Sequence, residues 1–274
     1  EPDENDRNLI GQIATARAML ALVQYRAEDI IAQSQRAQAY LRSDNLGSRF
    51  TATWTMGVAH QLQGDRAAAT RAYAEALSIC QMSGNNFHMT LVTNSLGQIQ
   101  EDENQLYLAA ESYRRVLQLF GDYPLPSASE ACLGLARICY EWNDLDAAQQ
   151  YGQQALHLAR QYDRKIDRFI FSEVFLARLK LARGDVAGAA AMLAETSQSV
   201  QQHNYVHRIP DVAAQQVIVL LHQGDPEAAA QLAQAHELPI SRARVLLAQG
   251  DPSAALAVLE PLRQQMEAKG WADE

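Results

Sequence analysis

The sequence is poor in cysteine, proline and aromatic residues, and each scarcity excludes a class of protein. Its 274 residues include 3 cysteines, 8 prolines and 7% aromatic residues. The cysteines are Cys80, Cys132 and Cys139. An odd, sparse set does not build a disulfide framework and favours a reducing compartment, so we expect a cytoplasmic protein. The one cluster of β-branched and aromatic residues is at 169–171, so no β-sheet is expected.

Long apolar runs and an excess of positive charge are also absent. No stretch of 18 consecutive apolar residues occurs, so no membrane span is expected. The acidic start at residues 1–6 is unlike a signal peptide. Lys and Arg number 23 against 32 Asp and Glu, which gives a formal net charge of −9. A surface of this charge repels phosphate backbones, so direct nucleic-acid binding is not expected.

Alanine, leucine and glutamine dominate instead, and this composition favours helix throughout. A two-residue corner recurs, and its first residue is Gly64, Asn104, Asn143, Gly184, Gly224 or Gly250. The successive steps are 40, 39, 41, 40 and 26 residues, so the last unit is shortened. Gly and Asn adopt the left-handed conformation that ends a helix, and the Asp that follows in five corners caps the next one. Each corner therefore predicts a helix, a turn and a second helix.

Small residues flank the corners at fixed offsets. Seven residues before the corner lie Gly57, Gly97, Ala136, Ala177 and Ala243, with Val217 as the exception. Five residues after it lie Ala69, Ala109, Ala148, Ala189, Ala229 and Ala255, often followed four residues later by a large residue such as Tyr73 or Tyr113. Small residues at a helix crossing let antiparallel helices approach closely. With a weaker pair at 9–24 and 27–42, the pattern predicts an all-α solenoid of about seven helix pairs, a right-handed superhelix forming one domain over residues 1–274.

The repeat resembles the tetratricopeptide repeat, and its longer spacing resembles the sensor solenoid of MalT-like transcriptional activators, ATP-dependent STAND-type regulators of the LuxR group. The matching segments are residues 9–22, 60–77, 134–163 and 176–193, of which the third, with CYEWNDLDAAQQYGQQAL at 139–156, is the most specific. The resemblance implies a bacterial regulator whose solenoid binds an inducer or an inhibitory partner and controls ATP-dependent self-association. It also implies a nucleotide-binding module and a winged-helix arm before the solenoid and a helix-turn-helix after it.

The sequence contains no G-x-x-x-x-G-K-[ST] phosphate loop, so we expect no cofactor in this chain, with ATP on the nucleotide-binding module of the intact protein. The last nine residues, MEAKGWADE, resemble the start of another inter-helix segment. We therefore expect the chain to be a fragment of a larger regulator.

Candidate reactive groups are better explained by packing or solvation. Cys132 and Cys139 are seven residues apart on one helix face, which is typical of core packing. The seven histidines are scattered, and a site at His203 and His207 would fall in an expected loop, so no metal site is predicted. Neither a nucleophile–base arrangement nor paired carboxylates with a second catalytic feature can be argued. We predict that the chain is not an enzyme.

The predicted binding surface is the concave groove, which the first helix of each pair lines. In each first helix, the groove is faced by the positions one residue after and three residues before the small residue that precedes the corner. The position one helical turn further along faces it as well. The candidate ligand-binding residues at these positions are Trp54, Asn94, Gln98, Glu101, Arg137, Tyr140 and Arg178. One interpretation is that Arg137 and Arg178 form ion pairs with Glu101, Glu130, Glu141 or Glu173 and only solvate the groove. A second is that aromatic rings, amides and guanidinium groups bind a small inducer, such as a sugar or a carboxylated metabolite. A third is a scaffold that holds a peptide or helix of a regulatory protein.

Overall fold

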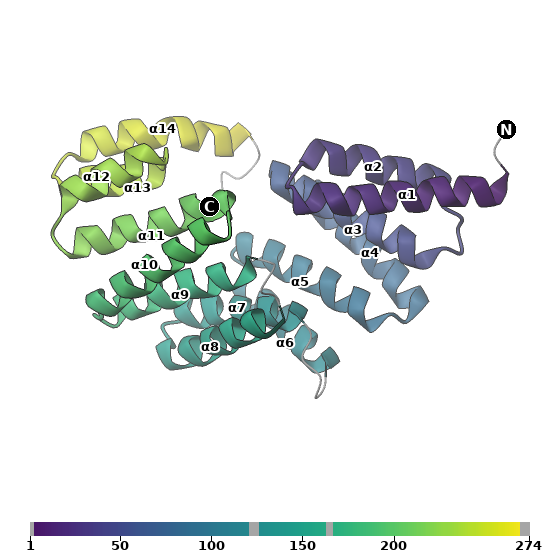
Figure 1. Cartoon of the computed structure of the whole chain (residues 1–274), viewed down its shortest axis with the longest axis horizontal. Helices are drawn as coiled ribbons and strands as arrows, with labels where there is room; N and C mark the ends of the chain where they lie inside the picture. Colours follow the sequence, from purple (N-terminus) through teal and green to yellow (C-terminus); the bar gives the residue numbers. More distant parts are fainter. Residues whose placement is uncertain (1–2, 121–125, 163–166, 269–274) are drawn as a thin grey trace. The chain divides into compact units, whose positions relative to one another are not determined.

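The computed structural model describes residues 3–120, 126–162 and 167–268 (Figure 1). These residues form fourteen α-helices and one 3-10 helix, and they contain no β-strand. The chain falls into two compact units, Glu1–Tyr123 and Pro124–Glu274. The predicted all-α helix-pair fold is confirmed, while the single domain over residues 1–274 stays a prediction.

The first unit contains three helix pairs. They are α1 (Glu4–Val23) with α2 (Ala27–Tyr40), α3 (Leu46–Gln63) with α4 (Arg66–Ser83), and α5 (Asn86–Asp102) with α6 (Leu106–Phe120). The weak pair predicted at the start of the chain is confirmed in α1 and α2.

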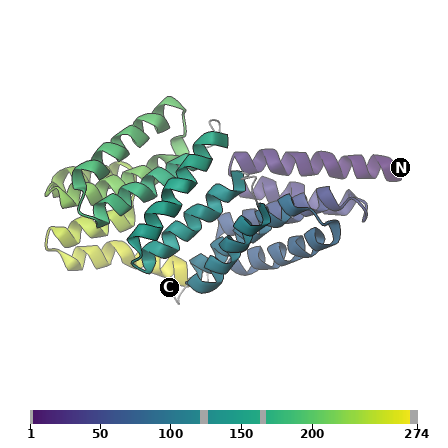
Figure 2. The same cartoon turned by 90° about the horizontal axis from the view of Figure 1, so that it is seen from below.

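The second unit contains four helix pairs and the 3-10 helix η1 (Val206–Arg208). The pairs are α7 (Pro126–Glu141) with α8 (Leu145–Tyr162), α9 (Arg168–Ala182) with α10 (Val186–Gln202), α11 (Ile209–His222) with α12 (Pro226–Ala235), and α13 (Pro239–Ala248) with α14 (Pro252–Ala268). The two helices of a pair run alongside each other in both views (Figures 1 and 2).

The predicted corners have the expected backbone and capping chemistry. All six corner residues have positive φ, from 57° at Asn104 to 83° at Gly250. The following Asp accepts a hydrogen bond from a backbone N–H in the first turn of the next helix, at 2.9 Å from Ala68 to Asp65 and 2.8 Å from Gly188 to Asp185. Each corner thereby satisfies polar groups that a helix end leaves without an intrahelical partner.

The helix crossings are as close as the small residues predict. The six alanines five residues after the corners are buried, with at most 2% exposure. At Gly57 a methyl group would lie 2.4 Å from Cε1 of Tyr73, and at Gly97 it would lie 2.7 Å from Cε1 of Tyr113. In α9 and α10, where the crossing residue is Ala177, the buried partner is the smaller Leu193. A glycine in the first helix is thus paired with a large tyrosine in the second helix, and an alanine in the first helix is paired with a smaller leucine.

Consecutive first helices contact one another directly within each unit, α1 with α3 and α3 with α5, and likewise α7 with α9, α9 with α11 and α11 with α13. Among the described residues, consecutive second helices make no comparable contact. The first helices are therefore the more closely spaced layer in each unit, as they would be on the inner side of a curved stack.

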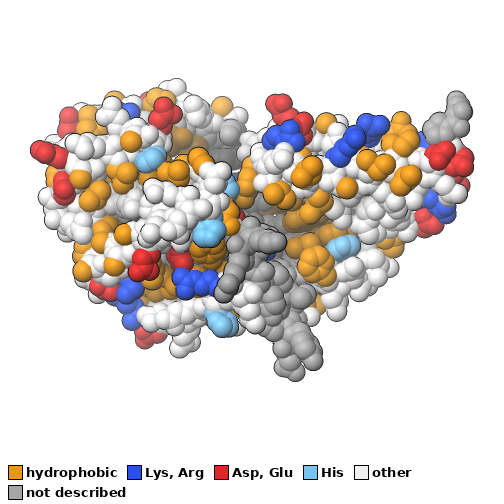
Figure 3. All heavy atoms as spheres, in the orientation of Figure 1, with side chains coloured by type: hydrophobic (Ala, Val, Ile, Leu, Met, Phe, Trp, Pro, Cys, Tyr) orange, Lys and Arg blue, Asp and Glu red, His pale blue; other side chains and the backbone are white. Residues whose placement is uncertain are grey.

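Helix α1 exposes a face that the following first helices bury. Ile13 and Leu20 lie five residues before and two after the buried Ala18, and they are 46% and 59% exposed. The residues at these two offsets in α3 and α5 are Ala52, Ala59, Val92 and Ile99, all at most 2% exposed. Hydrophobic side chains are accordingly visible at the surface over α1 (Figure 3).

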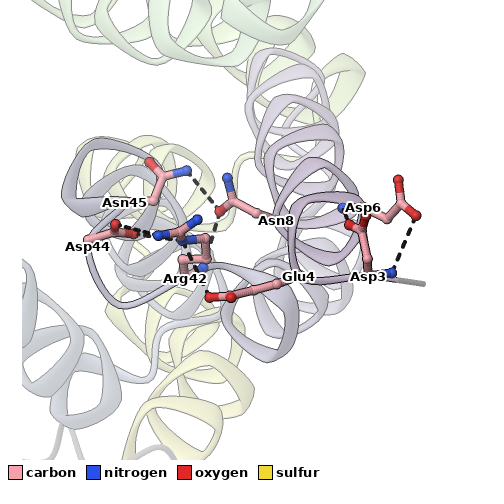
Figure 4. A network of polar contacts seen from close by, with 7 residues as sticks. All are labelled: Asp3, Glu4, Asp6, Asn8, Arg42, Asp44 and Asn45. Atoms are coloured by element: carbon pink, nitrogen blue, oxygen red, sulfur yellow. Dashed lines mark hydrogen bonds and ion pairs between the residues drawn. The ribbon is translucent and has the colours of Figure 1, made fainter. Parts of the chain in front are cut away.

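A polar network fastens the start of α1 to the loop between α2 and α3 (Figure 4). Asn8 Oδ1 accepts hydrogen bonds from the backbone N–H of Arg42 and from Nδ2 of Asn45, both at 3.2 Å. The Arg42 guanidinium donates to both carboxylate oxygens of Asp44, at 3.2 and 2.9 Å. Asp3 and Asp6 form a capping box that starts α1.

The sequence GDYPLPSAS at 121–129 and the stretch 203–208 are both expected to be loops between helix pairs, but each contains helical residues. Helix α7 begins at Pro126, because proline fits the first position of a helix; residues 121–125 lie outside the described part. Residues 206–208, within the predicted loop at 203–208, form η1. Across the described residues, no helix combines the length and the apolar character that a membrane crossing requires.

Candidate ligand-binding surface of the first helices

The seven predicted site residues all lie on first helices and are divided between the two units. Trp54 is on α3, while Asn94, Gln98 and Glu101 are on α5. Arg137 and Tyr140 are on α7, and Arg178 is on α9. Each group is therefore described within its own unit.

In the first unit, Trp54 joins neighbouring helix pairs through a hydrogen bond. Its indole Nε1–H donates to Ser95 Oγ at 3.0 Å, and this hydroxyl donates to the Leu91 carbonyl at 3.1 Å. The indole is partly buried, and Asn94, next to Ser95, is only 1% exposed. Gln98 is partly exposed one turn further along α5. Trp54 and Gln98 thus reach solvent, whereas Asn94 is buried.

Glu101 belongs to a repeated contact between first and second helices that the sequence reasoning missed. Glu101 Oε2 accepts a hydrogen bond from the Tyr113 hydroxyl at 2.9 Å, and Gln61 Oε1 accepts one from Tyr73 at 2.8 Å. Both acceptors lie four residues after the glycine on which the tyrosine ring packs. This shared offset is the signal that could have identified the contact in the sequence.

In the second unit, Tyr140 and Arg178 lie together. The Arg178 guanidinium carbon is 4.5 Å from the centre of the Tyr140 ring, and Nη2 is 3.4 Å from Glu141 Oε1. Phe175 contacts the Tyr140 ring edge-on at 6.1 Å. Arg137 is partly buried one turn before Tyr140 on α7. The surface thus presents an aromatic ring, a guanidinium group and a carboxylate.

The ion-pair interpretation describes part of this surface. Arg178 pairs with Glu141, as predicted, and both side chains are about half exposed, so the pair contributes little stability. Two other predicted carboxylates pair elsewhere, Glu130 with Arg168 at 3.1 Å and the buried Glu173 with Arg160 at 2.6 Å.

A buried charged cluster near η1 was not predicted. The Asp167 carboxylate accepts hydrogen bonds from His207 Nε2 and Arg208 Nε, both at 2.5 Å. Burial disfavours the charged form of Asp167, but the hydrogen bonds from Arg208 and His207 outweigh it and hold its pKa below the ordinary value. The Arg208 guanidinium also lies 3.9 Å from the Phe171 ring centre. This cluster joins the start of α9 to η1; Asp167 and Arg208 are largely buried, whereas the His207 side chain is 44% exposed.

The three cysteines are free and buried, which confirms the core packing predicted for Cys132 and Cys139. Burial raises the pKa of the Cys80 thiol to about 11 and that of Cys132 to about 12. The thiolate is the reactive form of cysteine, so the thiols of Cys80 and Cys132 are expected to be unreactive in the folded protein. No group of three or more His, Cys, Asp or Glu side chains suited to a metal ion occurs within the described ranges.

Comparison with solved structures shows the fold. A Rap protein complexed with Competence and Sporulation Factor is 13% identical, with 99% of this chain and 78% of that chain covered and a TM-score of 0.73. A Signal Transduction ATPase with Numerous Domains (STAND) protein with a tetratricopeptide repeat sensor, from Pyrococcus horikoshii, is 15% identical. The match covers 93% of this chain and 41% of that chain, with a TM-score of 0.60. The Rap conjugation gene regulator of plasmid pLS20 in complex with the Phr* peptide is 14% identical. The match covers 93% of this chain and 85% of that chain, with a TM-score of 0.58.

A search of curated proteins found no match. The family model for the MalT-like TPR region, in contrast, matches residues 11–274. This range includes both units and every corner. The chain therefore belongs to the MalT-like TPR region family.

Proposed function

We propose that this chain is the effector-sensing module of a MalT-like bacterial transcriptional regulator of the LuxR group. An inducer or a regulatory protein binds the first-helix surface and controls ATP-dependent self-association and activation of transcription. The observation that carries this proposal is the family match across both units, together with the exposed Tyr140–Arg178 surface that a ligand can reach.

The chemistry of the Tyr140–Arg178 surface favours a carboxylated metabolite or a sugar acid. Arg178 is held by an exposed ion pair with Glu141, so a ligand carboxylate can take the place of Glu141 at little cost. Its planar guanidinium group suits bidentate recognition of a carboxylate. The Tyr140 ring, supported by Phe175, offers an apolar platform beside it.

A ligand at this surface transmits a signal only if it has different affinities for two conformations of the intact regulator. Arg178 and Tyr140 belong to neighbouring helix pairs, α7–α8 and α9–α10. A ligand that contacts both favours one spacing of the two pairs. This gives the differential affinity that an inducer requires.

The experiment is calorimetric titration of the chain with a panel of sugars, sugar acids and carboxylated metabolites. Binding should be weakened at least tenfold by Arg178→Ala and Tyr140→Leu. The matched control is Arg26→Ala, which removes a similarly exposed arginine paired with Asp29 at 2.9 Å in the first unit. Absence of binding across the panel, with unaltered induction by Arg137→Ala and Arg178→Ala in the intact regulator, would refute the proposal.

A second candidate function is a scaffold that binds a peptide or helix of a partner protein. It is favoured by the pLS20 Rap regulator, which has this fold and was solved with the Phr* peptide. In this chain such a peptide would run across the first helices near Trp54, Gln98 and Glu101 or near Arg137. A stoichiometric protein partner captured by the purified chain, with capture lost in Trp54→Ala and no response to small molecules, would support this function over the first.

A further inference from the structure

A second candidate site lies on the opposite side of α9 from the Tyr140–Arg178 surface. A pocket of about 200 Å³ lies between α8, α9 and α10. Its lining includes Leu176 and Leu179 of α9 and Arg183, the residue that caps the end of α9. At 3.6 residues per turn, they centre on a direction roughly 140° around the helix from Arg178. The pocket is therefore distinct from the surface in the proposed function, and the inference below does not depend on that function.

The floor of the pocket is aliphatic. It consists of Leu176, Leu179 and Met192, and the first two are almost fully buried. A floor of this kind binds apolar groups, and the flexible methionine adapts to their shape. The volume is below the range of drug-sized pockets and corresponds to roughly seven water molecules at liquid density. A pocket of this size and lining suits a small molecule with a short aliphatic tail.

The rim of the pocket carries two cations, Lys180 and Arg183, and the carboxylate of Asp185, and each cation forms an exposed ion pair. Lys180 Nζ is 2.8 Å from Asp185 Oδ2, and Arg183 Nη2 is 2.5 Å from Asp146 Oδ1. These ion pairs are exposed, and the Asp146 side chain is 89% exposed. Exposed pairs are worth little, so a ligand carboxylate can replace the Asp146 carboxylate on Arg183 without a large penalty.

Two amides line the wall that α8 contributes. Gln149 and Gln153 are one turn apart on the same face of α8, and both border the pocket. Within the described residues, neither side-chain amide has a hydrogen-bond partner. Such amides can donate to, or accept from, a polar substituent beside a carboxylate. The aliphatic floor, the two amides and the two rim cations thus border one small volume.

We infer that this pocket binds a short-chain aliphatic carboxylate with a polar substituent on the α-carbon, the chemistry shared by branched-chain α-keto acids and aliphatic α-amino acids. The carboxylate pairs with Arg183 and Lys180, the α-substituent hydrogen-bonds to Gln149 and Gln153, and the aliphatic tail lies on Leu176, Leu179 and Met192. The ligand contacts both α8 and α9–α10, so it joins two neighbouring helix pairs from the side away from Arg178.

The experiment is calorimetric titration of the whole chain with 4-methyl-2-oxopentanoate, L-leucine and 4-methylpentanoate, which lacks the α-substituent. The expected result is saturable binding of the keto acid or the amino acid at millimolar concentration or below, and weaker binding of 4-methylpentanoate. Arg183→Ala should weaken binding at least tenfold. Arg178→Ala should leave it unchanged, which separates this site from the one in the proposed function.

A matched pair of substitutions tests the location. Gln153→Trp places an indole in the mouth of the pocket and should abolish binding. Gln154→Trp adds the same side chain at the next exposed position of α8, outside the pocket, and should leave binding intact. Circular dichroism and thermal unfolding confirm that each variant is folded. Absence of saturable binding by all three probes, or binding that survives both Gln153→Trp and Arg183→Ala, would overturn the inference.

Discussion

Gly57→Ala tests whether the tyrosine-filled crossings set the stability of the first unit. The added methyl group would lie 2.4 Å from Cε1 and 2.6 Å from Cδ1 of Tyr73, well inside van der Waals contact. The Tyr73 ring is fully buried and its hydroxyl donates to Gln61 at 2.8 Å. The ring therefore has to shift by about 1 Å and strain or lose this hydrogen bond, because close-packed interiors have few voids to receive it.

The magnitude follows from three contributions. Overpacking of a well-packed core costs about 3 kcal/mol at the upper end of its usual range. Loss of the tyrosine hydrogen bond adds about 1 kcal/mol. Replacing glycine by alanine inside a helix stabilises the helix by about 1 kcal/mol and offsets part of this cost. We expect Gly57→Ala to lower the free energy of unfolding by about 3 kcal/mol, or the melting temperature by about 10 °C.

The assay is urea unfolding followed by circular dichroism. Gly47→Ala is the matched control on the same helix, because a methyl group there meets nothing within 4 Å and should be neutral or slightly stabilising. The double variant Gly57→Ala/Tyr73→Leu copies the Ala177–Leu193 crossing of the second unit. It should be more stable than the sum of the single effects predicts, by about 2 kcal/mol. Equal stability of Gly57→Ala and the unaltered chain, or purely additive effects in the double variant, would refute the packing argument.

Three further predictions concern the corners, the Asp167 cluster and the thiols. Gly184→Ala, at a φ of +82°, should destabilise the second unit by about 1 kcal/mol in thermal unfolding, whereas Asn143→Gly, at a φ of +60°, should not. Asp167→Asn should cost about 3 kcal/mol at pH 7. Because the folded pKa of Asp167 is depressed, this contribution is fully present above the ordinary carboxyl pKa and is lost as the pH falls from there through the folded pKa, so urea unfolding at pH 3 should show a smaller difference than at pH 7. Cys80 and Cys132 should react with a thiol reagent at pH 8 only after unfolding; rapid reaction in the native protein would contradict their burial and raised pKa values.

The fold could be predicted because its determinants are local. A Gly or Asn marks each corner, and in five of the six the next residue is an Asp that caps the following helix. The two residues of a crossing, such as Gly57 and Tyr73, are sixteen positions apart. Which side chains lie on first helices also follows from helical periodicity. These features depend on one helix pair at a time, so one sequence is enough to reveal them.

The contacts of the site could not be predicted because they join different pairs. Trp54 and Ser95 are 41 positions apart, and Asp167 and Arg208 are also 41 apart. Whether such residues meet depends on how far one pair is displaced along its neighbour, and no repeat spacing records that displacement. Arg208 also lies in the stretch at 203–208 that the pattern assigned to a loop, where helical periodicity gives no information.

The exposed face of α1 has a consequence for the order in which the first unit opens. Among the described residues, the α1–α2 pair stacks only on α3, so its opening breaks one interface, whereas α3–α4 is held on both sides. In a one-dimensional stack the terminal member opens at the lower free energy. Backbone amides of α2 should therefore exchange with solvent deuterium faster than those of α4, and a proteolytic nick under native conditions should fall between Tyr40 and Leu46 before it falls anywhere in α3 or α4.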